Sequence, residues 1–302
     1  ASPAQPAEPP QPRGGADRRP ATLPVTDIEK WIRDPYAIYA KRILRLRVLD
    51  EPGTSVGARE AGSLLHRVFE RAAREPSAPT VESLRAILDE EAPRHGFSDA
   101  DRAFWASAFA EALAWFAAFD ASRRESGAAY VEKTGEWTLP GVDPPFTLTA
   151  RADRIEVLRS GGAAIFDYKT SALPTDKQEK TNFSPQLPLT GAILAAGGFD
   201  GLPALETQEY RYLKLIGRSG EEEKDGFGHE GDDARAAIEH AEAALRRWIA
   251  LFDAPDAVWR SKPRAQFIKK GSRGDGDLEA DYDQLARRRE WMASDDAGGD
   301  GE

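Results

Sequence analysis

The sequence predicts an α/β fold in which helices flank a mixed central sheet, with additional helices before and after this core. Apolar residues recur at helical spacing over residues 57–123, and from Tyr130 the pattern changes to the two-residue alternation of strands. A helical segment at 184–198 then separates a strand that ends at Lys169 from another over 209–216. Such a strand–helix–strand crossover joins parallel strands of one sheet, and the preceding hairpin adds antiparallel ones.

The composition limits the class of protein. The chain has 302 residues, 40% of them hydrophobic, so it can bury a substantial core. Its 41 Lys and Arg residues and 51 Asp and Glu residues give a formal net charge of −10. Free-standing nucleic-acid-binding proteins are usually basic. The charge therefore argues against such a protein, and less strongly against a metal-dependent nuclease or a domain whose larger partner holds the DNA.

The chain has no cysteine. This excludes disulfides, thiolate zinc sites and a cysteine-ligated iron–sulfur cluster, and it suits a reducing compartment. No stretch approaches the about 20 apolar residues of a membrane span, so we expect no membrane association. The first residues have no apolar signal core, and we expect a cytoplasmic location.

We expect one domain over residues 23–292, between a disordered linker at 1–22 and a disordered acidic tail at 293–302. The first segment is rich in Pro and Ala and has no hydrophobic period. Since the chain begins with Ala rather than Met, we expect a fragment whose linker led back to another domain.

The first half is predicted to be helical. One helix contains Trp31, and Pro35 can begin the next one. A helix over 57–74 places His66 beside its apolar face, where a lone histidine is commonly a surface or core residue. Two further helices at 80–94 and 99–123 have apolar residues at helical spacing.

A hairpin follows, with strands at 147–157 and 165–170 joined by a turn around Ser160-Gly161-Gly162. A short turn there sets Asp153 opposite Asp167, and directly opposed side chains share one face of the sheet. Two carboxylates so close repel each other unless a cation lies between them. Oxygen ligands favour Mg²⁺ or Mn²⁺, and Lys169 lies two residues further along the same face. The alternative interpretation is a cross-strand salt-bridge cluster on a solvated face.

Two glutamates on the strand that begins at Tyr130, Glu132 and Glu136, could reach this region. Exposed glutamates are common on strands, so neither is a strong candidate by itself. After Lys169 we expect a polar loop over 171–181, and then a helix that begins at Ser184-Pro185-Gln186.

The rest of the chain has a predicted surface loop at 218–232, in which we expect His229 to be solvated. An amphipathic helix over 233–252 and a last helix over 279–292 flank the one concentrated basic stretch, at 260–273. This stretch could contact a nucleic-acid backbone, and a solvated loop is an equal alternative.

These segments together resemble the PD-(D/E)XK nuclease superfamily, and its RecB-like branch in particular, which has a restriction-endonuclease-like core. The matching segments are Leu65-His66, Ala152-Asp153-Arg154, Asp167-Tyr168-Lys169-Thr170 and Pro185-Gln186-Leu187. The chain is also similar to the AddB subunits of bacterial AddAB helicase–nucleases. That similarity lies in Leu23-Pro24-Val25-Thr26, Asp34-Pro35-Tyr36-Ala37, Ser184-Pro185-Gln186-Leu187-Pro188-Leu189 and Asp281-Tyr282-Asp283-Gln284-Leu285-Ala286-Arg287.

The resemblance implies a divalent-metal-dependent DNA nuclease. Asp153 and Asp167 would bind Mg²⁺ or Mn²⁺, with His66 as a further ligand and the Tyr168 carbonyl as another candidate. Lys169 would orient the attacking water and stabilise the transition state. Catalytic Gln186 would position Lys169 or the DNA backbone, although Thr190 stands where many relatives have Tyr.

The AddB likeness implies an exonuclease domain that processes double-strand breaks for recombinational repair, on the 5′-ended strand. Its partners would be DNA, as single-stranded ends from an unwound duplex, and an AddA-like helicase–nuclease subunit. Some AddB proteins hold an iron–sulfur cluster through cysteines, and this chain has none.

Two other hypotheses stay open. One is a nuclease fold without catalysis that binds DNA or a helicase partner, although binding alone does not need His66, Asp153, Asp167 and Lys169 together. The other is a stand-alone RecB-like exonuclease, against which the acidic charge and the proline-rich leader argue.

Overall fold

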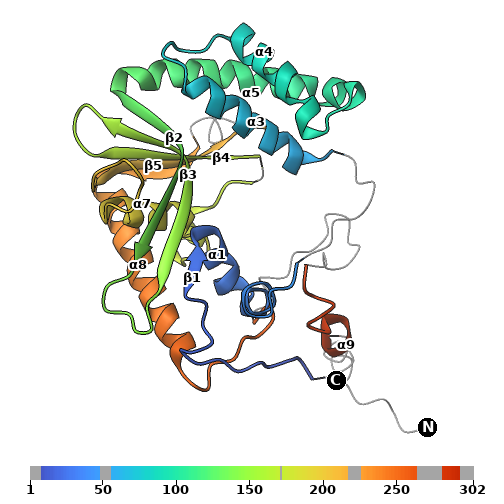
Figure 1. The fold of residues 1–302 in the computed structure, drawn as a ribbon, viewed down its shortest axis with the longest axis vertical. Helices are drawn as coiled ribbons and strands as arrows, with labels where there is room; N and C mark the ends of the chain where they lie inside the picture. The colour runs from blue at the N-terminus through green and yellow to red at the C-terminus, as the bar shows by residue number, and fades with distance from the viewer. Residues whose placement is uncertain (1–7, 48–55, 171, 217–225, 264–280, 293–302) are drawn as a thin grey trace, which may run out of the picture. The chain divides into compact units, whose positions relative to one another are not determined.

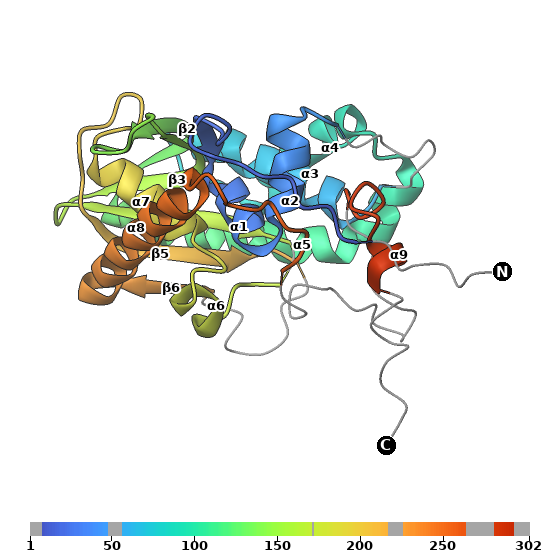
Figure 2. The same cartoon turned by 90° about the horizontal axis from the view of Figure 1, so that it is seen from below.

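The computed structural model describes residues 8–47, 56–170, 172–216, 226–263 and 281–292 (Figures 1 and 2). The chain divides into two compact units, and each is described by itself. The larger unit comprises Glu51–Trp137 and Leu148–Glu242; the smaller one comprises Ala1–Asp50, Thr138–Thr147 and Ala243–Glu302. The predicted tail at 293–302 and most of the basic stretch lie outside the described residues.

The sheet of the larger unit is mixed, as the sequence predicts. Its strands are β2 (Gly127–Thr138), β3 (Thr147–Leu158), β4 (Ala163–Lys169), β5 (Thr207–Lys214) and β6 (Phe227–Glu230). Strand β2 pairs with β3. Strand β4 is antiparallel to β3 and parallel to β5, while β6 is antiparallel to β5. The parallel pair confirms the predicted crossover.

Three long helices gather on one side of this sheet (Figure 1). They are α3 (Ala58–Ala73), α4 (Val81–Glu91) and α5 (Asp99–Ser126), with a short 3₁₀ helix, η2 (Pro93–His95), between the last two. Their apolar faces form one buried cluster with Phe166, Tyr168 and Leu213 of the sheet. This packing holds α3, and with it His66, against the end of β4.

Helix α7 (Gln186–Ala195) makes the crossover from β4 to β5, and nearly all of its side chains are buried. It begins one residue later than the sequence predicts, after Pro185. Helix α8 (Gly231–Asp253) packs against it. A Cβ atom at Gly191 of α7 would lie 2.6 Å from Ile238 Cδ1 of α8, so the two helices meet at a position that has no side chain.

Two predicted loops contain regular structure. The loop after Lys169 includes a one-turn helix, α6 (Asp176–Lys180), and the loop over 218–232 includes β6. Figure 2 shows α6 beside β6, where His229 Nε2 lies 2.5 Å from the buried Glu179 Oε1. The solvated position expected for His229 is therefore wrong, because this ion pair joins α6 to the edge strand.

The smaller unit contains β1 (Thr22–Pro24), α1 (Val25–Arg33), α2 (Pro35–Ile38), a π-helical turn η1 (Tyr39–Ile43) and α9 (Arg288–Met292). Its core surrounds the fully buried Trp31. The ring of Trp31 stacks on Trp259 at 5.8 Å and contacts Phe146 and Phe252 at 6.3 and 5.0 Å. The last helix is shorter than predicted, because residues 281–287 form turns.

The segment at 8–22 differs from the predicted linker. Arg19 is buried, and its Nε lies 2.5 Å from Asp253 Oδ1 while an Nη donates to the Pro144 carbonyl at 2.8 Å. The Trp259 amide donates to the Pro12 carbonyl at 2.9 Å. These partners are far away in the sequence, so the proline-rich composition gives no sign of them. The first seven residues lie outside the described residues.

Two cations of the basic stretch, Arg260 and Lys262, are described; Arg260 is exposed, whereas Lys262 forms an ion pair. The side chain of Lys262 is only 7% exposed, with Nζ 2.6 Å from Asp283 Oδ2, and Arg288 also pairs with this carboxylate at 2.9 Å. Lys262 therefore stabilises the smaller unit and is not available to a nucleic-acid backbone.

Candidate active site

The hairpin of β3 and β4 brings the two predicted aspartates together. Gly161 and Gly162 in its turn have φ values of 96° and 75°, which glycine adopts readily. The register pairs Arg154 with Phe166, and continuing it by one residue sets Asp153 opposite Asp167. There Asp153 Oδ2 accepts a hydrogen bond from the Tyr168 amide at 2.8 Å, which fixes one side of its carboxylate.

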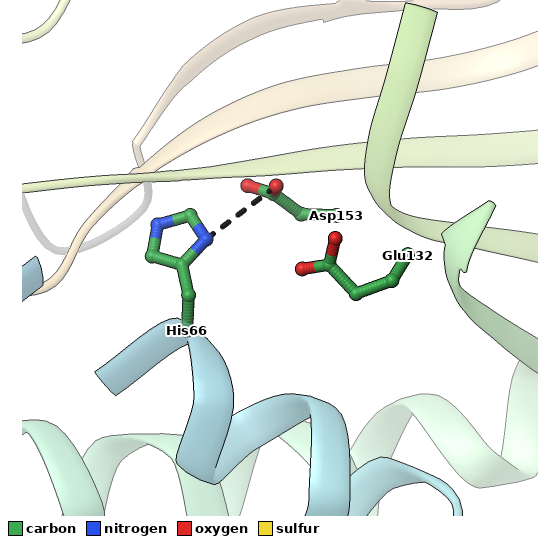
Figure 3. A group of neighbouring side chains, drawn as sticks. All are labelled: His66, Glu132 and Asp153. Atoms are coloured by element: carbon green, nitrogen blue, oxygen red, sulfur yellow. Dashed lines mark ion pairs between the residues drawn. The ribbon is translucent and has the colours of Figure 1, made fainter. Parts of the chain in front are cut away.

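His66 projects from α3 toward Asp153 (Figure 3). Its Nδ1 lies 3.4 Å from Asp153 Oδ1, and its Nε2 donates to the Tyr168 carbonyl at 2.9 Å. Burial by itself lowers the pKa of His66, but the Asp153 carboxylate outweighs burial and raises this pKa to about 9. The protonated His66 ring therefore offsets the negative charge of the Asp153 carboxylate.

Glu132 completes a group of three side chains that could hold a metal ion, called the ligating group below. Ligand atoms of His66, Glu132 and Asp153 all lie within 4.8 Å of one another (Figure 3). Burial raises the pKa of Glu132 and the nearby Asp153 raises it further, while a partner, Arg151, lowers it. The backbone of Glu132 has a φ of 53°, which is unusual for a residue other than glycine. Such a residue changes the direction of side chains along a strand.

Asp167, Lys169 and Gln186 form a second group beside the first. Lys169 Nζ lies 2.7 Å from Asp167 Oδ2 and donates to Gln186 Oε1 at 2.9 Å. Gln186 Nε2 donates to the other oxygen of Asp167 at 2.6 Å. Burial raises the pKa of Asp167, and Lys169 partly lowers it again. Thr190 Oγ1 donates to the Gln186 carbonyl at 2.8 Å, and this hydrogen bond stabilises the first turn of α7.

The structure thus divides the predicted site residues between the two groups. His66 and Asp153 lie in the ligating group, with the Tyr168 carbonyl bound to His66. Asp167, expected as a metal ligand, instead has its carboxylate oxygens on Lys169 and Gln186. Glu132 is the candidate ligand that sequence reasoning did not select.

The donors of the first group fit a divalent cation. Carboxylate oxygens are preferred by Mg²⁺ and Mn²⁺, and neutral imidazole is a common ligand of transition metals. Binding requires His66 to release its proton, because only the neutral ring donates an electron pair to a metal.

The first group lines a cleft of about 670 Å³ that opens beside α3, and Thr170, which follows Lys169 of the second group, also lines it. Its lining comes from α3, from β2 and β3, and from His95 and Thr170. His66, Glu132 and Asp153 all lie on its wall, so the candidate metal site opens into the cleft.

A family model described as the PD-(D/E)XK nuclease superfamily matches residues 22–259. The chain belongs to this superfamily. Its members are usually metal-dependent nucleases and generally use divalent metals, which agrees with the acidic ligating group at the cleft. The mixed sheet flanked by helices is consistent with the fold of this superfamily.

Several curated relatives come from Rickettsia and are described as uncharacterized proteins. One from Rickettsia conorii is 31% identical over 194 residues, covering 60% of this chain and 23% of that protein. One from Rickettsia typhi is 31% identical over 209 residues, covering 65% and 24%. The chain spans about a quarter of the length of these relatives.

Among solved structures, the crystal structure of SSO0001 aligns with a TM-score of 0.31 and 14% identity, over 75% of this chain and 76% of that one. Within the described residues, we find no helix with the length and apolar character that crossing a membrane requires.

Proposed function

We propose that this PD-(D/E)XK domain hydrolyses DNA phosphodiester bonds with the help of a divalent metal. One observation carries the proposal: three side chains that could hold a metal line a cleft, and a lysine held by two partners directly precedes the cleft residue Thr170. A salt-bridge cluster explains the carboxylates alone, but it gives no reason for Gln186 to bind both Asp167 and Lys169.

In this proposal His66, Glu132 and Asp153 hold the metal, with Mg²⁺ or Mn²⁺ as the expected ion. The bound metal supplies Lewis-acid stabilisation and a more acidic water. Lys169 orients the attacking water and offsets the negative charge that develops on the phosphate. Gln186 positions Lys169 through the 2.9 Å hydrogen bond, and Asp167 keeps the ammonium charged and in place.

We further propose that the domain serves as the exonuclease of an AddB-like subunit, acting on the 5′-ended strand during recombinational repair. Two facts support this proposal: the AddB-like segments of the sequence, and a length of about a quarter of the curated relatives. The expected partners are single-stranded DNA ends and an AddA-like helicase–nuclease subunit.

Cleavage of end-labelled linear DNA tests the nuclease. The unsubstituted chain and Asp167→Ala are each incubated with Mg²⁺, Mn²⁺ or EDTA, alone and with an AddA-like partner. We expect metal-dependent cleavage that the variant loses, because Lys169 loses its carboxylate partner. Equal cleavage by the variant, or cleavage in EDTA, would contradict the proposal. If neither protein cuts even with the partner, the domain is a catalytically silent one that binds DNA or the helicase.

A further inference from the structure

We propose that Arg59, near the start of α3, binds a backbone phosphate of the DNA strand at a distance from the bond that is cut. This inference rests on the proposed nuclease and concerns how that site recognises a polymeric substrate. Three properties of the cleft lead to it: the face of α3 that lines it, the pairing of its arginines, and the spacing between Arg59 and the ligating group.

One face of α3 forms a wall of the cleft. The helix contributes Ala58, Arg59, Gly62, Ser63, His66, Arg67 and Glu70 to the lining. These positions lie three or four residues apart along one face. Between Arg59 and His66 this face carries only the small residues Gly62 and Ser63. A strand that reaches His66 from the direction of Arg59 therefore meets no large side chain of α3.

Gly62 also brings α3 close to the end of β4. A Cβ atom at this position would lie 2.9 Å from Thr170 Oγ1, and Thr170 follows the catalytic Lys169 directly. The small residues thus place the cleft wall and the lysine near each other, which joins the α3 face to the reacting groups.

Three arginines line the cleft, and they differ in their partners. Arg67 lies 2.8 Å from Glu70, and Arg151 pairs with Glu132. Arg59 is exposed, and within the part of the chain that the structure describes no carboxylate forms an ion pair with it. The neighbouring Glu60 interacts with Arg59 electrostatically but forms no ion pair with it, since its carboxylate accepts from the Gly57 amide, so a phosphate can bind the Arg59 guanidinium without breaking an ion pair.

The spacing decides which phosphate Arg59 contacts. Seven residues of helix separate it from His66, which corresponds to about 10 Å along the axis. Arg59 is therefore too far away to bind the phosphate that is cut beside His66 and Asp153. It is suited to a phosphate further along the same strand, so its effect should appear in the binding of long substrates and not in the chemical step.

The test measures binding of a fluorescent single-stranded oligonucleotide with Mg²⁺ present, in a Lys169→Ala background that blocks cleavage. Adding Arg59→Ala should weaken binding about three- to tenfold and reduce the slope of log affinity against log salt by about 0.7, the value for one phosphate contact on a single strand. Arg59→Lys should restore most of the slope.

Arg85→Ala is the matched control. Arg85 is exposed on α4 and does not line the cleft. Its removal changes the net charge equally and should leave both affinity and slope unchanged. An equal loss in this control would attribute the effect to net charge and overturn the inference, as would an unchanged affinity and slope in Arg59→Ala.

A second measurement uses the chain with Lys169 intact. Arg59→Ala should raise KM for the oligonucleotide but leave cleavage of bis(p-nitrophenyl) phosphate, which has a single phosphate, at the normal rate. Slower cleavage of this small diester in the variant would overturn the binding role. If the protein cuts DNA with a metal but Arg59→Ala changes neither binding nor KM, this inference alone is overturned. If Arg59→Ala weakens DNA binding but the protein never cuts, the proposed nuclease alone is overturned.

Discussion

Asp153 and Arg154 are neighbours on β3, yet their side chains belong to two very different charge clusters. Arg154 is fully buried, with guanidinium nitrogens 2.6 Å from Asp120 and 2.7 Å from Glu156. Arg123 adds a second permanent cation to Glu156 at 2.7 Å. Both carboxylates of this buried network therefore have an arginine that stays charged at any ordinary pH.

Asp153 lies on the cleft side, where the balance is different. The nearby carboxylate of Glu132 has Arg151 as a partner, but the Arg151 side chain is 65% exposed. Asp153 has the His66 ring, which is charged only while it is protonated. The comparison teaches that arginines permanently neutralise the carboxylates of the buried network. In the cleft, the proton on His66 neutralises Asp153, and a bound metal ion can replace that proton as the positive charge.

The largest effect should come from removing the lysine. Lys169→Ala should reduce metal-dependent DNA cleavage by at least about a hundredfold, as the loss of a group that stabilises transition-state charge does in other enzymes. Its melting temperature should stay close to normal, because Lys169 is partly exposed. Steady-state cleavage and a thermal melt measure the two effects, and normal cutting by the variant would exclude this role.

The next effect separates the two clusters. Asp120→Ala leaves Arg154 and Arg123 to share the single carboxylate of Glu156, so the buried network keeps excess positive charge and the free energy of unfolding should fall by about 3–5 kcal/mol. Asp153→Asn, whose site is one residue away from Arg154, should strongly reduce cleavage with a smaller loss of stability, because it removes the His66 contribution but leaves no buried charge without a partner. Urea denaturation of both variants measures the contrast. Similar stability losses would show that Asp153 is part of a structural salt-bridge cluster.

Gly62→Ala should have an intermediate effect, with cleavage reduced about tenfold. The added methyl group forces Thr170 to move, and Lys169 is its neighbour in the chain. The unfolding free energy should change little, since the better helix propensity of alanine, worth about 1 kcal/mol, offsets the clash. Ser63→Ala, on the same face, is the control and should cut normally. Normal cutting by Gly62→Ala would show that this close approach does not matter for the lysine.

The smallest effect is a pH dependence of the metal-free protein. The pKa of His66 is raised from 6.5 to about 9, so the protonated ring stabilises the folded state fully below about pH 6.5 and this contribution is lost as the pH rises through 9. Thermal melts in EDTA between pH 6.5 and 9 should show a falling melting temperature. His66→Gln should lessen the fall, and an equally steep fall in this variant would assign it to other groups.

Much of the site could be predicted from the sequence because it depends on short-range geometry. The two glycines of the turn, Gly161 and Gly162, fix the register of the hairpin, and this register alone brings Asp153 opposite Asp167. Lys169 lies on the same strand as Asp167, and Gln186 begins the next long helix. The two side chains meet because this helix packs back against the sheet in a single crossover connection. The helical pattern of the first half likewise follows from local apolar spacing.

The features that the sequence did not predict depend on backbone conformation or on distant partners. Simple alternation treats Glu132 and Glu136 alike, and the positive φ of Glu132 distinguishes them. Arg154 and Glu156 alternate like exposed residues, but α5 supplies Asp120 to bury them. The place of Arg19 depends on Asp253, which lies 234 positions later.

The central claim is that His66, Glu132 and Asp153 form a divalent-metal site, and Mn²⁺ binding measured by calorimetry and electron paramagnetic resonance tests it most directly. We predict one ion per chain, proton release from His66 on binding, and at least about tenfold weaker binding in Glu132→Gln and Asp153→Asn. Glu136→Gln, on the same strand but exposed, should bind Mn²⁺ normally. Mn²⁺ affinity that none of these substitutions changes would contradict the account.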